Sequence, residues 1–129
     1  MKTSNRAAIL LAHGSSDNLW LAPFELLLQQ LQNRLGAQKV VLAYMELAEP
    51  SLARQVQNLV QQGYDQIEII PLFFAKGMHL RKQVPKLLAQ LSSELLPSCP
   101  QLSLVLHEPV GLEAEVATAI SQVIARKLA

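Results

Sequence analysis

Four short runs of apolar residues divide the chain, and they constrain its fold more than any other feature of the sequence. The runs are Ala7–Ala12, Val40–Met45, Ile67–Phe74 and Leu102–Leu106. Each run is apolar without regular alternation, which is typical of strands that are buried on both faces of a parallel sheet. The spacing between their starts fits a repeated strand–helix–strand unit.

The segments between and after these runs carry apolar residues at helical spacing. The residues recur at intervals of three and four positions, so each set lies on one side of a helix that covers a sheet. The four sets are Phe24, Leu27, Leu28, Leu31 and Leu35; Leu52, Val56, Leu59 and Val60; Val84, Leu87, Leu88 and Leu91; and Val116, Ile120, Val123, Ile124 and Leu128. This order predicts one α/β domain over residues 1–129, a three-layer sandwich with a four-stranded, mostly parallel sheet and helices on both faces.

Turn and capping residues mark the ends of the predicted helices. Gly36 and Gly63 stand where the first two helices should end, because glycine enters the left-handed conformation at little cost. Pro50-Ser51 opens the second helix, and Pro85 fits the first turn of the third. Asp17 is expected to cap the first helix.

Composition excludes several classes of protein. Half of the 129 residues are hydrophobic and 16% are charged, which argues against a disordered chain. The net charge of +1 argues against a globally basic nucleic-acid binder. The single cysteine, Cys99, excludes an intramolecular disulfide and a four-cysteine zinc site. No apolar stretch approaches the ~20 residues of a membrane span, and no signal peptide is evident, so we expect a cytoplasmic protein without nucleic-acid or membrane partners.

Residues with useful chemistry collect at the carboxyl ends of the predicted strands, where open α/β sheets bind ligands. His13 follows the first run, Glu46 the second and His107 the fourth, while His79 lies shortly after the third. Imidazole is a good ligand for cobalt, nickel, iron or zinc, and neutral histidine can accept a proton. Two histidines and a carboxylate can therefore hold a divalent ion. His107 has no feature that singles it out for this role.

A basic segment accompanies His79. Lys76, Arg81, Lys82 and Lys86 supply four of the eleven basic residues, with no acidic residue between them. A cationic rim beside a metal site would attract a polyanionic small molecule. We therefore expect Lys76 and Arg81 to orient an anionic substrate.

Three motifs together resemble those of the short class II chelatases of the CbiX/SirB type. They are Leu-Ala-His13-Gly-Ser, Tyr-Met-Glu46-Leu-Ala-Glu-Pro-Ser and Pro71-Leu-Phe-Phe-Ala-Lys-Gly-Met-His79, with Pro85 six residues later. The resemblance covers essentially the whole chain. Members of this family insert cobalt, iron or nickel into sirohydrochlorin on the routes to cobalamin, sirohaem and coenzyme F430. The resemblance implies that this chain is a sirohydrochlorin metal chelatase, a lyase.

The resemblance also implies roles for individual residues. His13 and His79 would bind the metal, with His13 as proton acceptor, and Glu46 would contact the tetrapyrrole and receive or relay its pyrrole protons. The residues implied to line the substrate are Phe73, Phe74, Ala75, Lys76, Gly77 and Met78, with Arg81 at the rim. The divalent metal is a substrate, and no organic cofactor is needed. One departure is that Gly111 precedes Leu112-Glu113, where the family often has histidine-proline, so nothing is inferred for that loop.

Chain length adds an expectation about assembly. Larger class II chelatases resemble two such lobes facing across a cleft, so we expect a homodimer with the site between subunits.

Two alternative functions could use the same residues. A non-enzymatic metal or tetrapyrrole carrier would use the same histidines, although Glu46 favours the enzyme because a carrier removes no proton. A histidine-nucleophile phosphotransferase is disfavoured because Ala12 stands where such enzymes have arginine.

Overall fold

A four-stranded, entirely parallel sheet forms the centre of the molecule, with the strand order β2-β1-β3-β4. The structure is a computed structural model and describes residues 5–129. The strands are β1 (Arg6–Ala12), β2 (Lys39–Tyr44), β3 (Gln66–Pro71) and β4 (Ser103–Leu106). The predicted α/β class and all four strands are confirmed. The third strand ends at Pro71, so the rest of that apolar run continues as a loop at the carboxyl edge.

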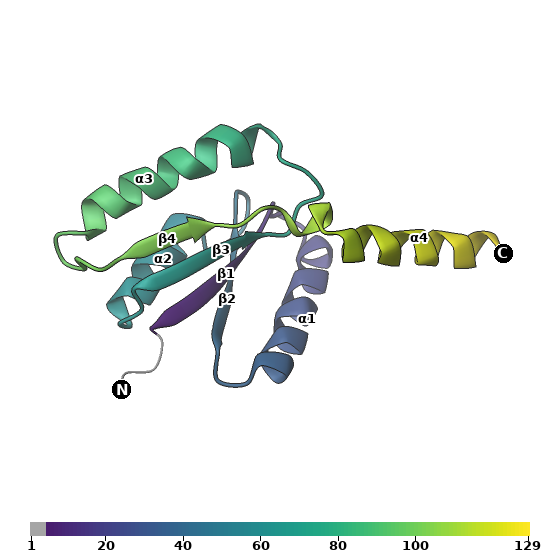
Figure 1. Cartoon of the computed structure of the whole chain (residues 1–129), viewed down its shortest axis with the longest axis horizontal. Coiled ribbons are helices and arrows are strands. Elements are labelled where there is room, and N and C mark those ends of the chain that lie inside the picture. The colour runs from purple at the N-terminus through teal and green to yellow at the C-terminus, as the bar shows by residue number, and fades with distance from the viewer. Residues whose placement is uncertain (1–4) are drawn as a thin grey trace.

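Four helices follow the four strands in turn. They are α1 (Asn18–Leu35), α2 (Leu52–Gln61), α3 (Val84–Leu95) and α4 (Ala114–Leu128). Helices α2 and α3 cover one face of the sheet, and α1 lies against the other (Figure 1). No helix within residues 5–129 is long and apolar enough to cross a membrane.

The helix ends follow the predicted capping residues. The side chain of Asp17 accepts a hydrogen bond of 2.9 Å from the backbone N–H of Leu19, and Ser51 caps α2 in the same way through Arg54 at 3.1 Å. Gly36 ends α1 with a φ of 63°, a conformation that glycine adopts without steric cost. These local rules explain why the helices begin and end close to their expected positions.

The main hydrophobic core lies between the sheet and the pair α2 and α3. Alternate side chains of a strand point to opposite faces, so Ile9 and Leu11 enter this core while Leu10 faces α1. The fully enclosed members of the main core include Ile9, Leu11, Val56, Leu59, Ile67, Ile69 and Val84. The smaller core beneath α1 is centred on Leu10, Val40 and Leu42.

The position of α4 contradicts the expectation that the last helix covers the sheet. It projects away from the body of the molecule (Figure 1) and, among the described elements, packs chiefly against the short 3₁₀ turn η2 (Val110–Leu112). None of its residues is buried, and Ile124 and Leu128 are 50% and 81% exposed. Helical spacing determines which side of a helix is apolar, but it does not determine which surface that side meets.

The half of the sheet formed by β3 and β4 is consequently open on the face that carries α1. Val105 of β4 pairs in register with Glu68 of β3, so their side chains share this face. Val105 is 46% exposed although it lies inside a strand. A single chain therefore leaves both an apolar helix side and part of a sheet face uncovered.

Candidate metal-binding site

His13 and His79 line one pocket at the carboxyl edge of the sheet. The pocket has a volume of about 370 Å³. Its other lining residues are supplied by the chain that follows β3, and they are Leu72, Phe73, Phe74, Ala75, Gly77 and Leu80. Carboxyl ends of neighbouring parallel strands meet at one edge, which explains why residues so distant in sequence lie together. The pocket offers two imidazoles within a mainly apolar wall.

The imidazole of His13 rests on the ring of Phe73. The two rings are stacked with centroids 4.1 Å apart and planes inclined by 21°. Phe73 is itself held by Gly111, whose backbone N–H donates a hydrogen bond of 2.9 Å to the Phe73 carbonyl. A side chain at Gly111 would collide with the backbone of Phe73 and Phe74, so only glycine permits this close approach. The stacked Phe73 ring thus limits the rotation of an otherwise exposed His13.

Glu46 lies beside His13 along the sheet edge but outside the histidine pocket. The backbone N–H of Glu46 donates to the carbonyl of His13 at 3.1 Å. Gly14 has a φ of 94°, and a Cβ there would collide with the Glu46 carbonyl oxygen, so the two loops are in direct contact. The Glu46 side chain is exposed and does not line the pocket.

The potential metal ligands that one chain brings together in this pocket are the two imidazoles. Within residues 5–129, no group of three or more His, Cys, Asp or Glu residues is close enough to hold a metal ion. Two imidazoles leave most coordination positions of a divalent ion open, which suits a bound ion that is passed on rather than stored. The sequence predicts Glu46 at the same sheet edge as the histidines, and the structure places it one loop away from their pocket.

His79 begins a short π-helical turn, η1 (His79–Gln83), that leads into α3. The N–H of Val84 donates to the His79 carbonyl across this wide turn. Pro85 has no N–H to donate to the carbonyl of Arg81, and its ring crowds that carbonyl, which favours the wider turn. Nδ1 of the half-buried His79 contacts Oε1 of Gln83. Gln83 is not among the residues predicted for the site, although its spacing of four residues from His79 is the sequence signal for such a contact.

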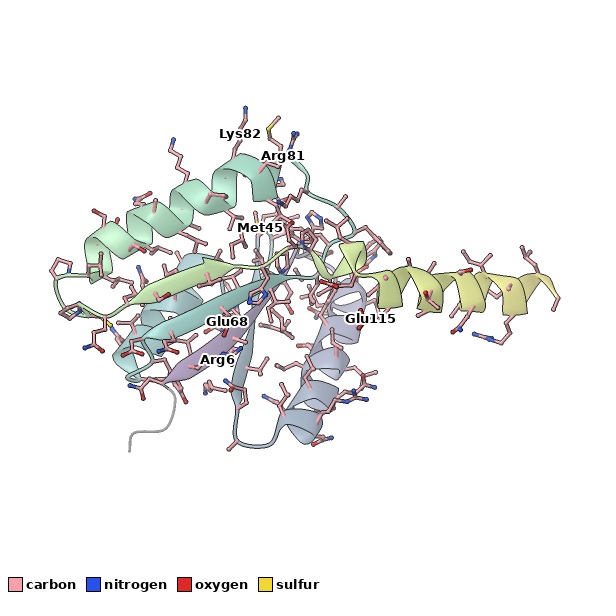
Figure 2. The ribbon with its side chains drawn as sticks, in the orientation of Figure 1. Arg6, Met45, Glu68, Arg81, Lys82 and Glu115 are labelled. Atoms are coloured by element: carbon pink, nitrogen blue, oxygen red, sulfur yellow. The ribbon has the colours of Figure 1, made fainter. Side chains whose placement is uncertain are left out.

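The basic segment forms a rim next to the histidine pocket rather than part of it. Lys76 and Arg81 line a neighbouring pocket of about 300 Å³ together with His107 and Glu108. The ammonium of Lys76 pairs with Glu108 at 2.8 Å, and both side chains are exposed. Figure 2 shows Arg81 pointing outward near the start of α3, as Lys82 also does. Met78 is exposed and does not line the histidine pocket.

The third histidine belongs to a separate cluster. Nε2 of His107 lies 2.6 Å from a carboxylate oxygen of Glu68, and the other oxygen of Glu68 accepts from Arg6. Glu68 and Arg6 lie on the strands of the sheet, away from the start of α3 (Figure 2). Hydrogen bonds from Arg6, and secondly from His107, lower the pKa of the Glu68 carboxyl. His107 thus has a partner of its own and does not line the pocket of His13 and His79.

Comparison with known proteins gives consistent matches in sequence and in fold. A family model described as CbiX matches residues 7–127. The sirohydrochlorin cobaltochelatase of Sulfolobus acidocaldarius is 26% identical over 108 residues, which cover 84% of this chain and 80% of that protein. The sirohydrochlorin cobaltochelatase of Methanopyrus kandleri is 29% identical over 82 residues, or 64% of this chain and 57% of that protein.

Two solved structures show the same fold. A putative cobalamin biosynthesis CbiX protein from Marinobacter aquaeolei matches with a TM-score of 0.81 and 39% identity, covering 95% of this chain and 97% of that one. The sirohydrochlorin chelatase SirB from Bacillus subtilis subspecies spizizenii, solved in complex with cobalt, matches with a TM-score of 0.80 and 21% identity. The match covers 94% of this chain but only 50% of the SirB chain, so this chain corresponds to half of SirB.

Proposed function

The chain belongs to the CbiX family, and on that premise we propose that it inserts a divalent metal ion into sirohydrochlorin. The ion is Co²⁺, Fe²⁺ or Ni²⁺, and the product serves the biosynthesis of cobalamin, sirohaem or a related tetrapyrrole. The observation that carries this proposal is the single pocket lined by His13 and His79. The cytoplasmic location predicted from the sequence remains part of the proposal.

Insertion exchanges two pyrrole protons for one M²⁺ ion, so the site must supply a metal and remove two protons. His13 and His79 bind the ion through neutral imidazole, which holds cobalt or ferrous iron reversibly. Once the macrocycle nitrogens take over as ligands, the lone pair of the neutral His13 imidazole is free to accept a proton. The stacked Phe73 keeps the His13 ring in place during this exchange.

Glu46 carries protons away from the reacting nitrogens. It is exposed to solvent, and its loop contacts the His13 loop through the backbone. A carboxylate at this position can receive a proton and release it to water. Two bases side by side at one edge meet the need to remove two protons from one macrocycle.

Residues around the pocket orient the macrocycle. Phe74, Ala75 and Gly77 line the pocket wall, and the exposed Met78 follows them on the same loop. Lys76 and Arg81 bind substrate carboxylates at the rim. Lys76 exchanges Glu108 for a substrate carboxylate at little cost, because an exposed ion pair contributes only about 0–1 kcal/mol.

A homodimer completes the site. A pocket of about 370 Å³ on one chain is too small to enclose a flat tetrapyrrole. The apolar side of α4 and Val105 on the β3–β4 half of the sheet are both exposed in one chain, and α4 projects away from its own sheet (Figure 1). We infer that α4 of each copy covers the open face of the other. The correspondence of this chain to half of SirB supports the same arrangement.

The test is an assay of metal insertion. Purified protein is mixed with sirohydrochlorin and with Co²⁺, Fe²⁺ or Ni²⁺ in turn, and the visible spectrum of the tetrapyrrole reports the rate of insertion. We expect acceleration with at least one metal, and a loss of about 100-fold or more in His79→Ala. His107→Ala is the matched control for binding of Co²⁺ in the absence of sirohydrochlorin, because that histidine does not line the pocket of His13 and His79, and it should bind Co²⁺ as the wild type does. Metal binding without acceleration would identify a carrier and reject the chelatase.

A further inference from the structure

One contact determines which nitrogen of His79 can bind a metal ion. Nδ1 of His79 contacts Oε1 of Gln83. An amide oxygen only accepts hydrogen bonds, so the ring proton is assigned to Nδ1 in this contact. A neutral imidazole has one N–H, and the lone pair available to a metal therefore lies on Nε2.

The local fold keeps the two side chains in this arrangement. Both belong to the π-turn η1, whose wide hydrogen bond joins Val84 to His79. Leu80 within the turn is buried in the main core, which anchors η1 beneath its side chains. Gln83 is exposed and does not line the histidine pocket, so it reaches the ring of His79 from outside the pocket.

We propose that Gln83 is a positioning residue that fixes His79 in the Nδ1–H tautomer and presents Nε2 to the metal ion. The proposal deepens the proposed function and rests on it for the fate of the bound ion. Groups that hold the second nitrogen of a metal-binding histidine orient the ring and tune the affinity of the site. The orienting group in this chain is a neutral amide rather than a carboxylate.

A neutral orienting group suits a ligand that must release its metal. A carboxylate on Nδ1 would make the imidazole a more basic ligand and would add negative charge close to the cation. An amide fixes the tautomer without either effect. Gln83 therefore favours transfer of the ion to the macrocycle over its retention by the protein.

Nuclear magnetic resonance of the imidazole nitrogens in the metal-free protein measures the tautomer directly. We expect the Nδ1–H form of His79 in the wild type and a shift toward the Nε2–H form in Gln83→Leu. Gln83→Glu retains an acceptor oxygen and should restore the Nδ1–H form. The matched control is Gln90→Leu, which removes another exposed glutamine whose amide donates to Glu94 at 3.2 Å. An unchanged His79 tautomer in Gln83→Leu would overturn the proposal.

Titration with Co²⁺ alone, followed by visible absorption, measures the consequence for the metal. Gln83→Leu should weaken binding by about 10- to 100-fold, while Gln83→Glu binds at least as tightly as the wild type. In the insertion assay, Gln83→Glu should lower kcat and leave KM for sirohydrochlorin unchanged, because the ion is released more slowly. Equal Co²⁺ affinity in the wild type and Gln83→Leu would contradict the positioning role.

These measurements separate the two proposals. The tautomer and the Co²⁺ affinity are measured without sirohydrochlorin. Loss of insertion activity in the wild type, combined with the expected response of Gln83→Leu, would reject the chelatase and retain the positioning role. Normal insertion by the wild type, combined with an unchanged His79 tautomer and Co²⁺ affinity in Gln83→Leu, would retain the chelatase and reject the positioning role.

Discussion

The two faces of the sheet differ in how completely they are covered. On the face of α2 and α3, Val56, Leu59 and Val84 pack against strand residues, and their exposure is 0–1%. On the opposite face, α1 covers β1 and β2 and has no fully buried residue of its own. The β3–β4 half of that face carries the partly exposed Val105 and the charged Glu68, which pairs with Arg6 of β1.

The difference separates the layer that a single chain completes from the layer that the proposed homodimer would cover. The covered face gives the chain its stability, because burial of apolar area dominates the free energy of folding. On the open face, Val105 remains 46% exposed although it lies inside a strand. We therefore interpret the open face as an interface and the covered face as the stable core of each copy.

The same substitution on the two faces tests this comparison with the largest expected effect. Leu59→Ala removes a fully enclosed side chain beneath α2 and should lower the free energy of unfolding by about 3–4 kcal/mol. Leu31→Ala on α1 removes a side chain that is only partly buried, and should cost about 1–2 kcal/mol. Urea unfolding at low protein concentration measures both. Equal losses would mean that α1 is packed as tightly as α2.

A charge on the apolar side of α4 tests whether the open face is an interface. Ile120→Asp should raise the dimer dissociation constant by about 100-fold, because a carboxylate would have to be desolvated in the contact. Helical spacing places Gln122 on the opposite side of α4, so Gln122→Asp is a control with the same charge change. Light scattering coupled to size-exclusion chromatography measures the assembly. A monomeric wild type with full insertion activity would reject the dimer.

Glu68 gives the smallest expected effect and a defined pH dependence. Its folded-state pKa is lowered by Arg6 and His107, so the unfolded chain binds more protons in the acidic range and stability falls as the pH drops through that pKa. Glu68→Gln should cost about 1 kcal/mol at neutral pH, because both partners are half-exposed. The difference from wild type should shrink as the pH is lowered into the acidic range, as measured by urea unfolding. A difference that does not change with pH would exclude this linkage.

Much of the site could be predicted because it depends on order along the chain. His13 and the loop before His79 follow neighbouring parallel strands, so the topology alone brings them to one edge. Three features of the site could not be predicted. They are the Lys76–Glu108 pair, the His107–Glu68 contact and the position of Glu46 outside the pocket. Each depends on the direction of a loop side chain, and that direction is set by backbone contacts such as the one between Gly14 and Glu46.

The sequence by itself determined the α/β class, the order of strands and helices, and the edge at which the histidines gather. These follow from local preferences, since the apolar period and the capping residues act over a few positions. Only the tertiary structure decided that His107 pairs with Glu68 and that α4 leaves its own sheet uncovered. Contacts of this kind depend on the free energy of bringing distant surfaces together, and a periodic pattern specifies a surface without specifying its partner.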